Sequence, residues 1–299
     1  MEAGVQRFAC TQCGKCCNRS PEVELSEAAA LADVFVFRLM FRLHWLPRRL
    51  RDYLALGRRE GNASAAFYEK KRLLGAFSAR TYALKLSRNG KPVEYNKYLA
   101  ISALALDTSP GACSALRGKQ CGIYHRRPLS CRSVPLHYSR AEALAEADLK
   151  AFVLTPGYDC DTSATAPVLV RNGRIVAPEI TAARLEASET AQRDRRWGEA
   201  IARQMNGDPL GLLPSLQEIE DSAQVGALTS SMRAAWRIAA DVALIAPEEC
   251  DRLVELQLQT IGRELAQSRC SQAVREMLAD MHAEYRHHLC NDHATAANG

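Results

Sequence analysis

The amino-acid sequence predicts a mainly α fold with minor β, in which helices wrap an irregular cysteine-rich core, a short β-hairpin follows, and a helical bundle ends the chain. Three observations predict this fold. Most apolar segments have the spacing of helices rather than the alternation of strands. One short segment has the signature of a hairpin. Eight of the eleven cysteines lie within the first 160 residues, several of them among Gly and Pro residues.

The first half of the chain is predicted to contain a series of helices. Ser26 is a suitable N-cap and Glu27 a suitable first-turn acid, so a helix is expected to begin there and to run through residues 28–46. Asn89 and Gly90 indicate a turn. Further helices are expected over residues 50–56, 63–74, 95–106 and 141–150.

The second half combines a hairpin with longer helices. Asn172 and Gly173 separate two short apolar runs, residues 168–170 and 175–177, which is the pattern of a hairpin with a tight turn. Helices are expected over residues 181–205, 229–245, 247–265 and 270–289. We therefore divide the chain into a cysteine-rich domain, residues 1–165, with a helical insertion at about 18–112, and a hairpin-and-helix region, residues 166–299.

Composition and charge narrow the class of protein. The 299 residues are 47% hydrophobic and 24% charged, with a net charge of +5, which is ordinary for a globular protein of one or two domains. The first residues have no apolar core of a secretory signal, so a cytoplasmic location is expected. The most apolar stretch, residues 28–46, contains Asp33, Arg38 and Arg42, which argues against a membrane span.

The first cysteine cluster comprises Cys10, Cys13, Cys16 and Cys17. Thiolates are soft ligands that favour zinc and iron–sulfur clusters, and a C-x-x-C turn brings two of them to one metal. Outside a secretory context such clusters bind metals more often than they form disulfides. Adjacent side chains point apart, so Cys16 and Cys17 are not expected to bind one tetrahedral ion. One of them therefore serves a second metal, a polynuclear cluster or a reactive role.

A second group of cysteines lies on predicted loops. Cys113, Cys121 and Cys131 are surrounded by Gly and Pro, and loops suit irregular metal ligation. The alternative is that they are buried core thiols. Cys160 stands apart from both groups and is either a further ligand or an isolated thiol.

Two blocks of this sequence carry a resemblance to a known family. Residues 8–17 read FACTQCGKCC, and residues 121–135 contain Cys-Gly-Ile-Tyr, Arg-Pro, Cys-Arg and a final Pro. Over roughly residues 8–160 the chain resembles the bacterial CxxCxxCC (YkgJ-type) cysteine-cluster family of zinc- or iron-chelating domains. The resemblance implies metal ligation by Cys10, Cys13, Cys16, Cys17, Cys113, Cys121 and Cys131, with Cys160 as an additional ligand.

The same resemblance extends to flagellin lysine-N-methylase, a member of that family associated with an iron–sulfur cluster. It implies an iron–sulfur cluster or iron as cofactor, with zinc as the alternative, and S-adenosylmethionine as a methyl donor. Arg127 and Arg132, beside the second block, are candidates for binding an anionic cofactor or substrate, or else bridge loops to carboxylates. His287 and Cys290 share a helix face and form either a second metal site or a polar helix end.

Three functional hypotheses follow. The first is a metalloenzyme with an iron–sulfur or iron centre, acting in redox chemistry or in methyl transfer to a protein lysine. The second is a structural zinc module that presents the helical half to a protein partner, and the third is metal storage or delivery. Aromatic residues make up 6% of the chain, too few to favour nucleic acid as the partner.

Overall fold

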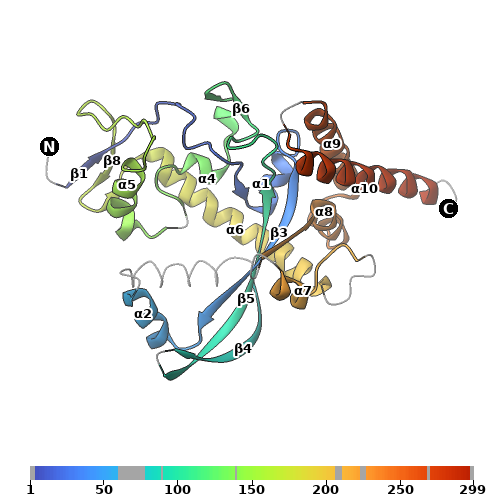
Figure 1. Ribbon diagram of the computed structural model, residues 1–299, viewed down its shortest axis with the longest axis horizontal. Helices are drawn as coiled ribbons and strands as arrows, with labels where there is room; N and C mark the ends of the chain where they lie inside the picture. The colour runs from blue at the N-terminus through green and yellow to red at the C-terminus, as the bar shows by residue number, and fades with distance from the viewer. Residues whose placement is uncertain are drawn as a thin grey trace. The chain divides into compact units, whose positions relative to one another are not determined.

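The fold is described from a computed structural model of the chain (Figure 1). The structure describes residues 4–59, 78–88, 90–138, 140–205, 211–222, 227–267 and 270–296. It divides the chain into two compact units, each assembled from three segments. The first unit comprises Met1–Cys16, Leu43–Ala100 and Leu116–Arg195, and the second comprises Cys17–Arg42, Ile101–Ala115 and Arg196–Gly299. The boundary expected near residue 165 stays a prediction.

The predicted fold class is wrong. Across the described residues the chain is 46% helical and 21% strand, with three small sheets, so the fold is mixed α and β rather than mainly α with minor β. The difference arises mainly from two apolar stretches that were predicted as helices. Residues 28–46 contain only the short helix α1 (Leu25–Ala30) before strand β3 (Phe37–Pro47), and residues 95–106 lie almost entirely in strand β5 (Lys91–Ala105).

The second unit contains one end of a five-stranded sheet. Strand β10 (Ala227–Ser231) pairs antiparallel with the first half of β3, and β2 (Glu22–Val23) pairs antiparallel with the end of β5. Residues 229–245, expected to be wholly helical, therefore begin in β10 and continue as α8 (Met232–Asp241). Helix α1 begins two residues earlier than expected, because Glu24 is its N-cap and forms a capping box with Glu27.

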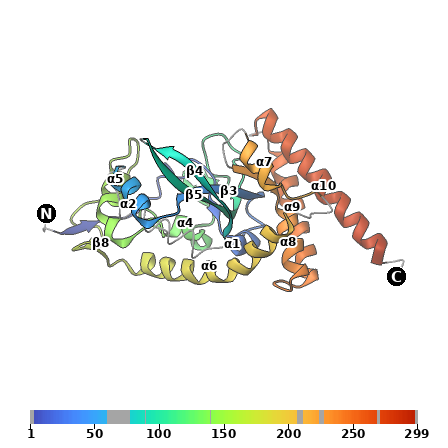
Figure 2. The ribbon, with the colours of Figure 1, turned by 90° about the horizontal axis from the view of Figure 1, so that it is seen from below.

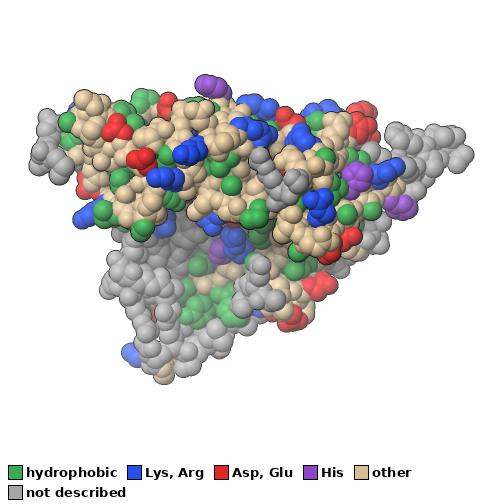
Figure 3. Space-filling model, turned by 45° about the horizontal axis from the view of Figure 1, so that its top comes forward, with side chains coloured by type: hydrophobic (Ala, Val, Ile, Leu, Met, Phe, Trp, Pro, Cys, Tyr) green, Lys and Arg blue, Asp and Glu red, His purple; other side chains and the backbone are tan. Residues whose placement is uncertain are grey.

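The C-terminal helices of the second unit confirm the predicted helical region. Helix α9 (Pro247–Ala266) packs against α8 and against α10 (Gln272–Ala296), as Figure 2 shows. Their shared core includes Ile261 and Leu278, both fully buried. A short helix, α7 (Leu216–Asp221), precedes β10 and is capped by Ser215. Figure 3 shows charged side chains of both signs on one face of the molecule. None of the helices in the described ranges combines the length and apolarity that a membrane crossing requires.

The first unit contains the predicted hairpin. Strands β8 (Val168–Arg171) and β9 (Arg174–Ile175) pair antiparallel, and β1 (Val5–Arg7) joins the other side of β8. Asn172 and Gly173 have φ values of 50° and 75°, as a type I′ turn requires. The hairpin prediction is confirmed. Helix α6 (Pro178–Gln204), which confirms the helix expected over residues 181–205, begins directly after it and continues into the second unit.

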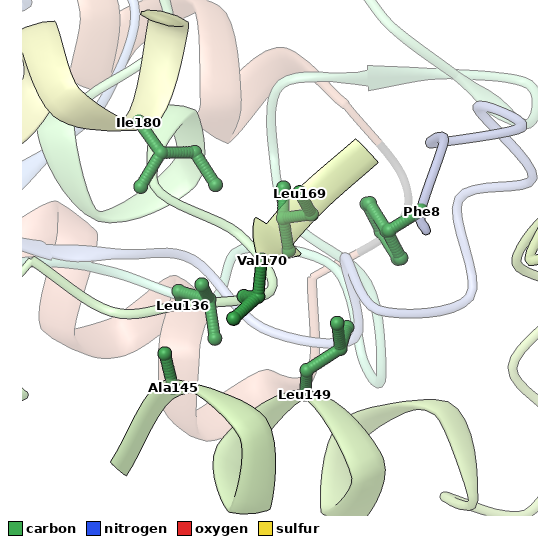
Figure 4. Packing of buried hydrophobic residues seen from close by; sticks show 7 residues of the cluster. All are labelled: Phe8, Leu136, Ala145, Leu149, Leu169, Val170 and Ile180. Carbon is green, nitrogen blue, oxygen red and sulfur yellow. The ribbon is translucent and has the colours of Figure 1, made fainter. Parts of the chain in front are cut away.

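A hydrophobic cluster joins this small sheet to neighbouring helices (Figure 4). Phe8 follows β1 and meets Phe152 of α5 (Ala145–Val153) edge to face, with ring centroids 6.0 Å apart. Leu149 of α5 and Val170 of β8 are buried in the same cluster. The N-terminal segment is thus anchored immediately before the first cysteine.

The remaining elements of the first unit are short, apart from one long strand. Helix α2 (Leu50–Arg59) confirms the helix expected over residues 50–56, and β4 (Ser78–Arg88) pairs antiparallel with β5. The helix expected over residues 63–74 and the turn residue Asn89 lie outside the described residues. The cysteine-rich part contains β6 (Leu116–Arg117), β7 (Gln120–Cys121), the 3-10 turns η1 (Tyr124–Arg126) and η2 (Glu142–Leu144), and α4 (Leu129–Arg132).

One buried side chain forms hydrogen bonds with the backbone of the segment that connects α1 and β3. Gln257 of α9 is fully buried, and its amide donates hydrogen bonds to the carbonyls of Ala32, at 2.8 Å, and Phe35, at 2.7 Å. Its carbonyl oxygen accepts from the N–H of Phe37 at 2.9 Å. One buried side chain thus pairs three backbone groups, and the Ala32 carbonyl also accepts from the Thr260 hydroxyl at 2.9 Å.

Substitution Gln257→Leu is expected to lower the free energy of unfolding by about 2–5 kcal/mol, because it removes the side chain that pairs the Phe35 carbonyl and the Phe37 N–H, and each buried polar group left without a partner costs about 1–3 kcal/mol. Gln259→Leu on the exposed face of the same helix is the matched control and should change it by less than about 0.5 kcal/mol. Denaturant unfolding followed by circular dichroism measures both. Equal effects of the two substitutions would contradict this account.

Candidate metal centre

A backbone bridge brings Cys160 to the first cysteine cluster. The N–H of Ala9 donates to the carbonyl of Asp161 at 2.8 Å, and the N–H of Asp161 donates back to Ala9 at 3.1 Å, which forms an isolated antiparallel bridge. The hydroxyl of Thr11 donates to the carbonyl of Asp159. Extending this antiparallel register by one residue would place Cys10 opposite Cys160.

The thiol of Cys13 lies among hydrogen-bond donors. The backbone N–H of Lys15 lowers the pKa of Cys13 most, and the hydroxyl of Thr11 and the N–H of Asp159 lower it further. Partial burial and the neighbouring thiol of Cys16 oppose the shift, but the pKa remains below its ordinary value. These donors favour the thiolate, the form that binds metals.

Cys160 shows the opposite shift. Burial raises its pKa most, and the negative charges of Cys13, Cys16 and Cys10 raise it further, in that order. Charges act on one another this way only at short range. Cys10, Cys13 and Cys16 therefore lie within electrostatic range of Cys160, and we call these four of the eight predicted ligands the gathered thiols.

A tight backbone contact links the first cysteine loop to the hairpin that carries Cys121. Gly14 has a φ of +73°, and a Cβ atom at this position would lie 2.5 Å from the carbonyl oxygen of Lys119. Lys119 lies in the turn between β6 and β7, and Cys121 ends β7. Only glycine satisfies both the left-handed conformation and the close approach. The two blocks of the cysteine pattern are therefore in contact through their backbones.

Cys131 lies on α4, which is fixed against α6. Leu129 of α4 is fully buried against Ala183 and Ala187 of α6. Arg132 forms an ion pair with Glu186 of α6 at 2.7 Å. The position of Cys131 in the fold therefore depends on the helix that follows the cysteine-rich segment.

Cys17 and Cys113 belong to the second unit. The N–H of Cys113 donates to the carbonyl of Cys17 at 2.9 Å. The boundary between the units falls between Cys16 and Cys17. Six of the eight predicted ligands are therefore in the first unit and two in the second.

The two candidate cofactor-binding arginines have structural contacts. The guanidinium of Arg127 stacks 3.8 Å above the ring of Tyr124, and its Nε donates to the Tyr124 carbonyl at 2.9 Å. Arg132 forms the ion pair with Glu186 described above. The Arg132 contact is a bridge to a carboxylate, whereas Arg127 contacts Tyr124 of its own loop, and the cofactor-binding role of both stays a prediction.

The thiols are gathered but not closed around an ion. None of the ten described cysteines forms a disulfide. Among the described residues, no three His, Cys, Asp or Glu side chains already have the spacing of a metal site. Thiolates without a cation between them repel, and a metal site is rarely preformed without its metal. The side chain of Cys290, paired with His287 in the sequence analysis, lies outside the described residues.

Sequence reasoning missed the two residues that hold the gathered thiols. Thr11 contacts Cys13 and the Asp159 carbonyl, and the backbone of Asp159 contacts both Thr11 and Cys13. Thr11 has a visible signal, since a hydroxyl two positions before a cysteine suits such a bond. Asp159 acts through its backbone groups, and any residue type has these groups, so its role could not be predicted from the sequence.

The described residues place these cysteines on short, irregular segments, and comparison with known proteins relates this part of the chain to a family of chelating domains. Residues 9–156 match the family model CxxCxxCC, described as "Putative zinc- or iron-chelating domain". This part of the chain belongs to the CxxCxxCC family, so the predicted family is confirmed. No curated protein and no solved structure matches the chain, and the resemblance to flagellin lysine-N-methylase stays a prediction.

Gly14→Ala is expected to lower the free energy of unfolding by about 2–4 kcal/mol, because it combines a left-handed backbone with a clash against Lys119. Gly118→Ala is the matched control, since Gly118 has a φ of +64° in the same unit but open space around it. It should cost only about 1–2 kcal/mol. Denaturant titration of both variants tests the contact, and equal losses would count against it.

In the metal-free chain, iodoacetamide is expected to alkylate Cys13 at lower pH than Cys160. Hydrogen bonds lower the pKa of Cys13, whereas burial and neighbouring thiolates raise that of Cys160. As the pH rises through the ordinary thiol range near about 8.5, Cys13 becomes a thiolate first. Peptide mass spectrometry after brief labelling gives both profiles. Thr11→Val should move the Cys13 profile to higher pH, and superimposable profiles in the wild type would refute the assignment.

Proposed function

We propose that the chain is a redox protein that binds an iron–sulfur cluster through Cys10, Cys13, Cys16 and Cys160. The membership of residues 9–156 in a zinc- or iron-chelating family supports the metal. Beyond this family membership, we propose that the metal centre is an iron–sulfur cluster, that these four cysteines are its ligands and that it transfers electrons. Cys160 lies beyond the segment that matches the family, so its inclusion rests on the fold.

The observation that carries the proposal is the bridge between Ala9 and Asp161. Its backbone hydrogen bonds hold Cys160 beside the first cysteine cluster, whether or not a metal is bound. Three cysteines at C-x-x-C-x-x-C spacing with one remote cysteine make the ligand set that bacterial ferredoxins use for each cluster. The C-x-x-C-x-x-C spacing is the feature that favours a cluster, and metal analysis distinguishes it from a zinc ion held by the same four thiolates.

The residues around the thiols suit such a centre. All four donors are soft thiolates. Hydrogen bonds to the sulfur of Cys13 from Lys15, Thr11 and Asp159 match those that set the reduction potential of iron–sulfur proteins. When bound, the cluster would supply one-electron transfer. The chain's own residues position the thiols and lower the pKa of Cys13.

Two other functions compete with this one. A structural zinc module would use the same four thiolates, and the family description includes zinc. Methyl transfer from S-adenosylmethionine to a protein lysine rests on the resemblance alone, and no described contact favours it, so it is not part of the proposal.

Anaerobic purification is expected to give brown protein with iron and acid-labile sulfide. Cys160→Ser should reduce bound iron about tenfold or more, because it removes a ligand. Cys270→Ser is the matched control, since Cys270 lies in the second unit, where its thiol contacts the Glu264 carbonyl at 3.7 Å. Metal analysis and visible absorption measure both variants. Colourless protein with one zinc per chain, or full iron in Cys160→Ser, would overturn the proposal.

A further inference from the structure

The charge of this chain is distributed unevenly around its cysteines. Residues 3–21 and 108–141 contain seven of the eleven cysteines and nine Lys and Arg residues, but no Asp or Glu. The chain has 34 acidic residues, so an even distribution would place about six of them in these stretches. Because the net charge of the whole chain is +5, the remainder is net negative. The positive charge of the protein is therefore concentrated in these two stretches, whereas the Cys160 segment carries Asp159 and Asp161.

Five of these cations are exposed in the first unit, and four of the five lie on the short segments that carry the two cysteine blocks. We call these four the basic rim: Lys15, Arg117, Lys119 and Arg126. The contact between Gly14 and Lys119 brings Lys15 beside the β6–β7 hairpin. Arg117 pairs with Gln120 across that hairpin, and Arg126 ends η1, five residues after Cys121. Figure 3 shows Lys and Arg side chains exposed on the surface of the molecule.

The rim residues are more exposed than two neighbouring arginines of the same stretches. Arg127 stacks on Tyr124 and Arg132 pairs with Glu186, so both are used internally. The rim residues present their side chains to solvent, in stretches without acidic residues of their own. Exposed charges of one sign concentrated in this way attract oppositely charged partners and guide their approach.

We propose that the basic rim is the docking surface for an acidic face of a protein partner that exchanges electrons with the metal centre. The electron exchange in this inference rests on the proposed function. The binding of an acidic partner by the basic rim does not depend on which metal is bound. Charged surfaces of this kind support transient complexes whose association is fast and weakened by salt.

The rim fits an acidic protein better than a nucleic acid. Binding of single strands uses exposed aromatic rings on which bases stack. The aromatic ring beside the rim, Tyr124, is covered on one face by Arg127, at 3.8 Å, and its edge meets His125. The rim therefore offers charge without a stacking platform.

The test uses the anaerobically purified full-length protein and two fluorescent probes, a poly-glutamate peptide of about 20 residues and a poly-dT strand of about 20 nucleotides. Anisotropy titrations are made at about 20 mM and about 200 mM NaCl, since screening separates these conditions. The peptide is expected to bind at low salt and to lose affinity at least about tenfold at high salt. The DNA strand is expected to bind more weakly than the peptide.

Charge-reversal variants locate the surface. Arg117→Glu/Lys119→Glu, on the β6–β7 hairpin, should weaken peptide binding about tenfold or more. Arg171→Glu/Arg174→Glu changes the same net charge at exposed positions flanking the β8–β9 turn and should have little effect. Equal losses in both variants, no peptide binding, or tighter binding of DNA that the hairpin variant abolishes, would each overturn the proposal.

Metal analysis of the same samples separates the two proposals. The hairpin variant should keep the metal content of the wild type while losing peptide affinity. If it loses metal as well, the rim serves the centre rather than a partner, and the docking proposal fails. If the wild type binds no iron but the hairpin variant still loses peptide affinity, the proposed cluster fails and the surface stands.

Discussion

The bridge between Ala9 and Asp161 is the interaction on which the rest of the candidate site depends. Cysteines 10, 13 and 16 lie on a loop with almost no regular structure, and such a segment would not by itself hold thiols beside a residue 150 positions away. Phe8, buried against α5 and β8, fixes one end of the loop. The reciprocal hydrogen bonds of the bridge then fix its direction, so that side-chain packing and backbone pairing together bring Cys160 to the first cysteine cluster.

An irregular loop suits these thiols because it leaves backbone donors unused. In a helix the N–H groups near Cys13 would be paired with carbonyls four residues earlier. Here Gln12 and Gly14 have positive φ values, 56° and 73°, and the N–H of Lys15 donates to the Cys13 sulfur. Successive N–H groups turned to one side make a site for negative charge. Glycine at position 14 therefore serves two needs, the turn of the loop and the approach of the Lys119 carbonyl.

The sequence predicted the structure correctly where the signals lie within one segment. It was ambiguous where the same spacing of residues fits both a helix and a strand. Asn172–Gly173 and the long helix α6 were predictable because turn chemistry and helical spacing each act within one segment. Arg38 and Arg42 are four residues apart, which fits one face of a helix and equally one face of a strand. The alternation of buried Phe37, Leu39 and Phe41 decides for a strand, but Met40 between them obscures it. The cysteines could be chosen as candidate ligands from their spacing, whereas the approach of Cys160 to the first cluster depends on a backbone bridge that residue types do not encode.

Lys15 shows how the site separates its short-range and long-range electrostatics. Its backbone N–H donates directly to the Cys13 sulfur, and that contact is independent of the side chain. Its ammonium group is exposed, where water and salt weaken its effect on the thiolates within about 8–10 Å. The backbone donors therefore stabilise the thiolates, while the exposed cations act mainly on charges that approach from solvent. Cations placed beside the cysteines therefore promote the approach of an acidic partner more than they stabilise the thiolates.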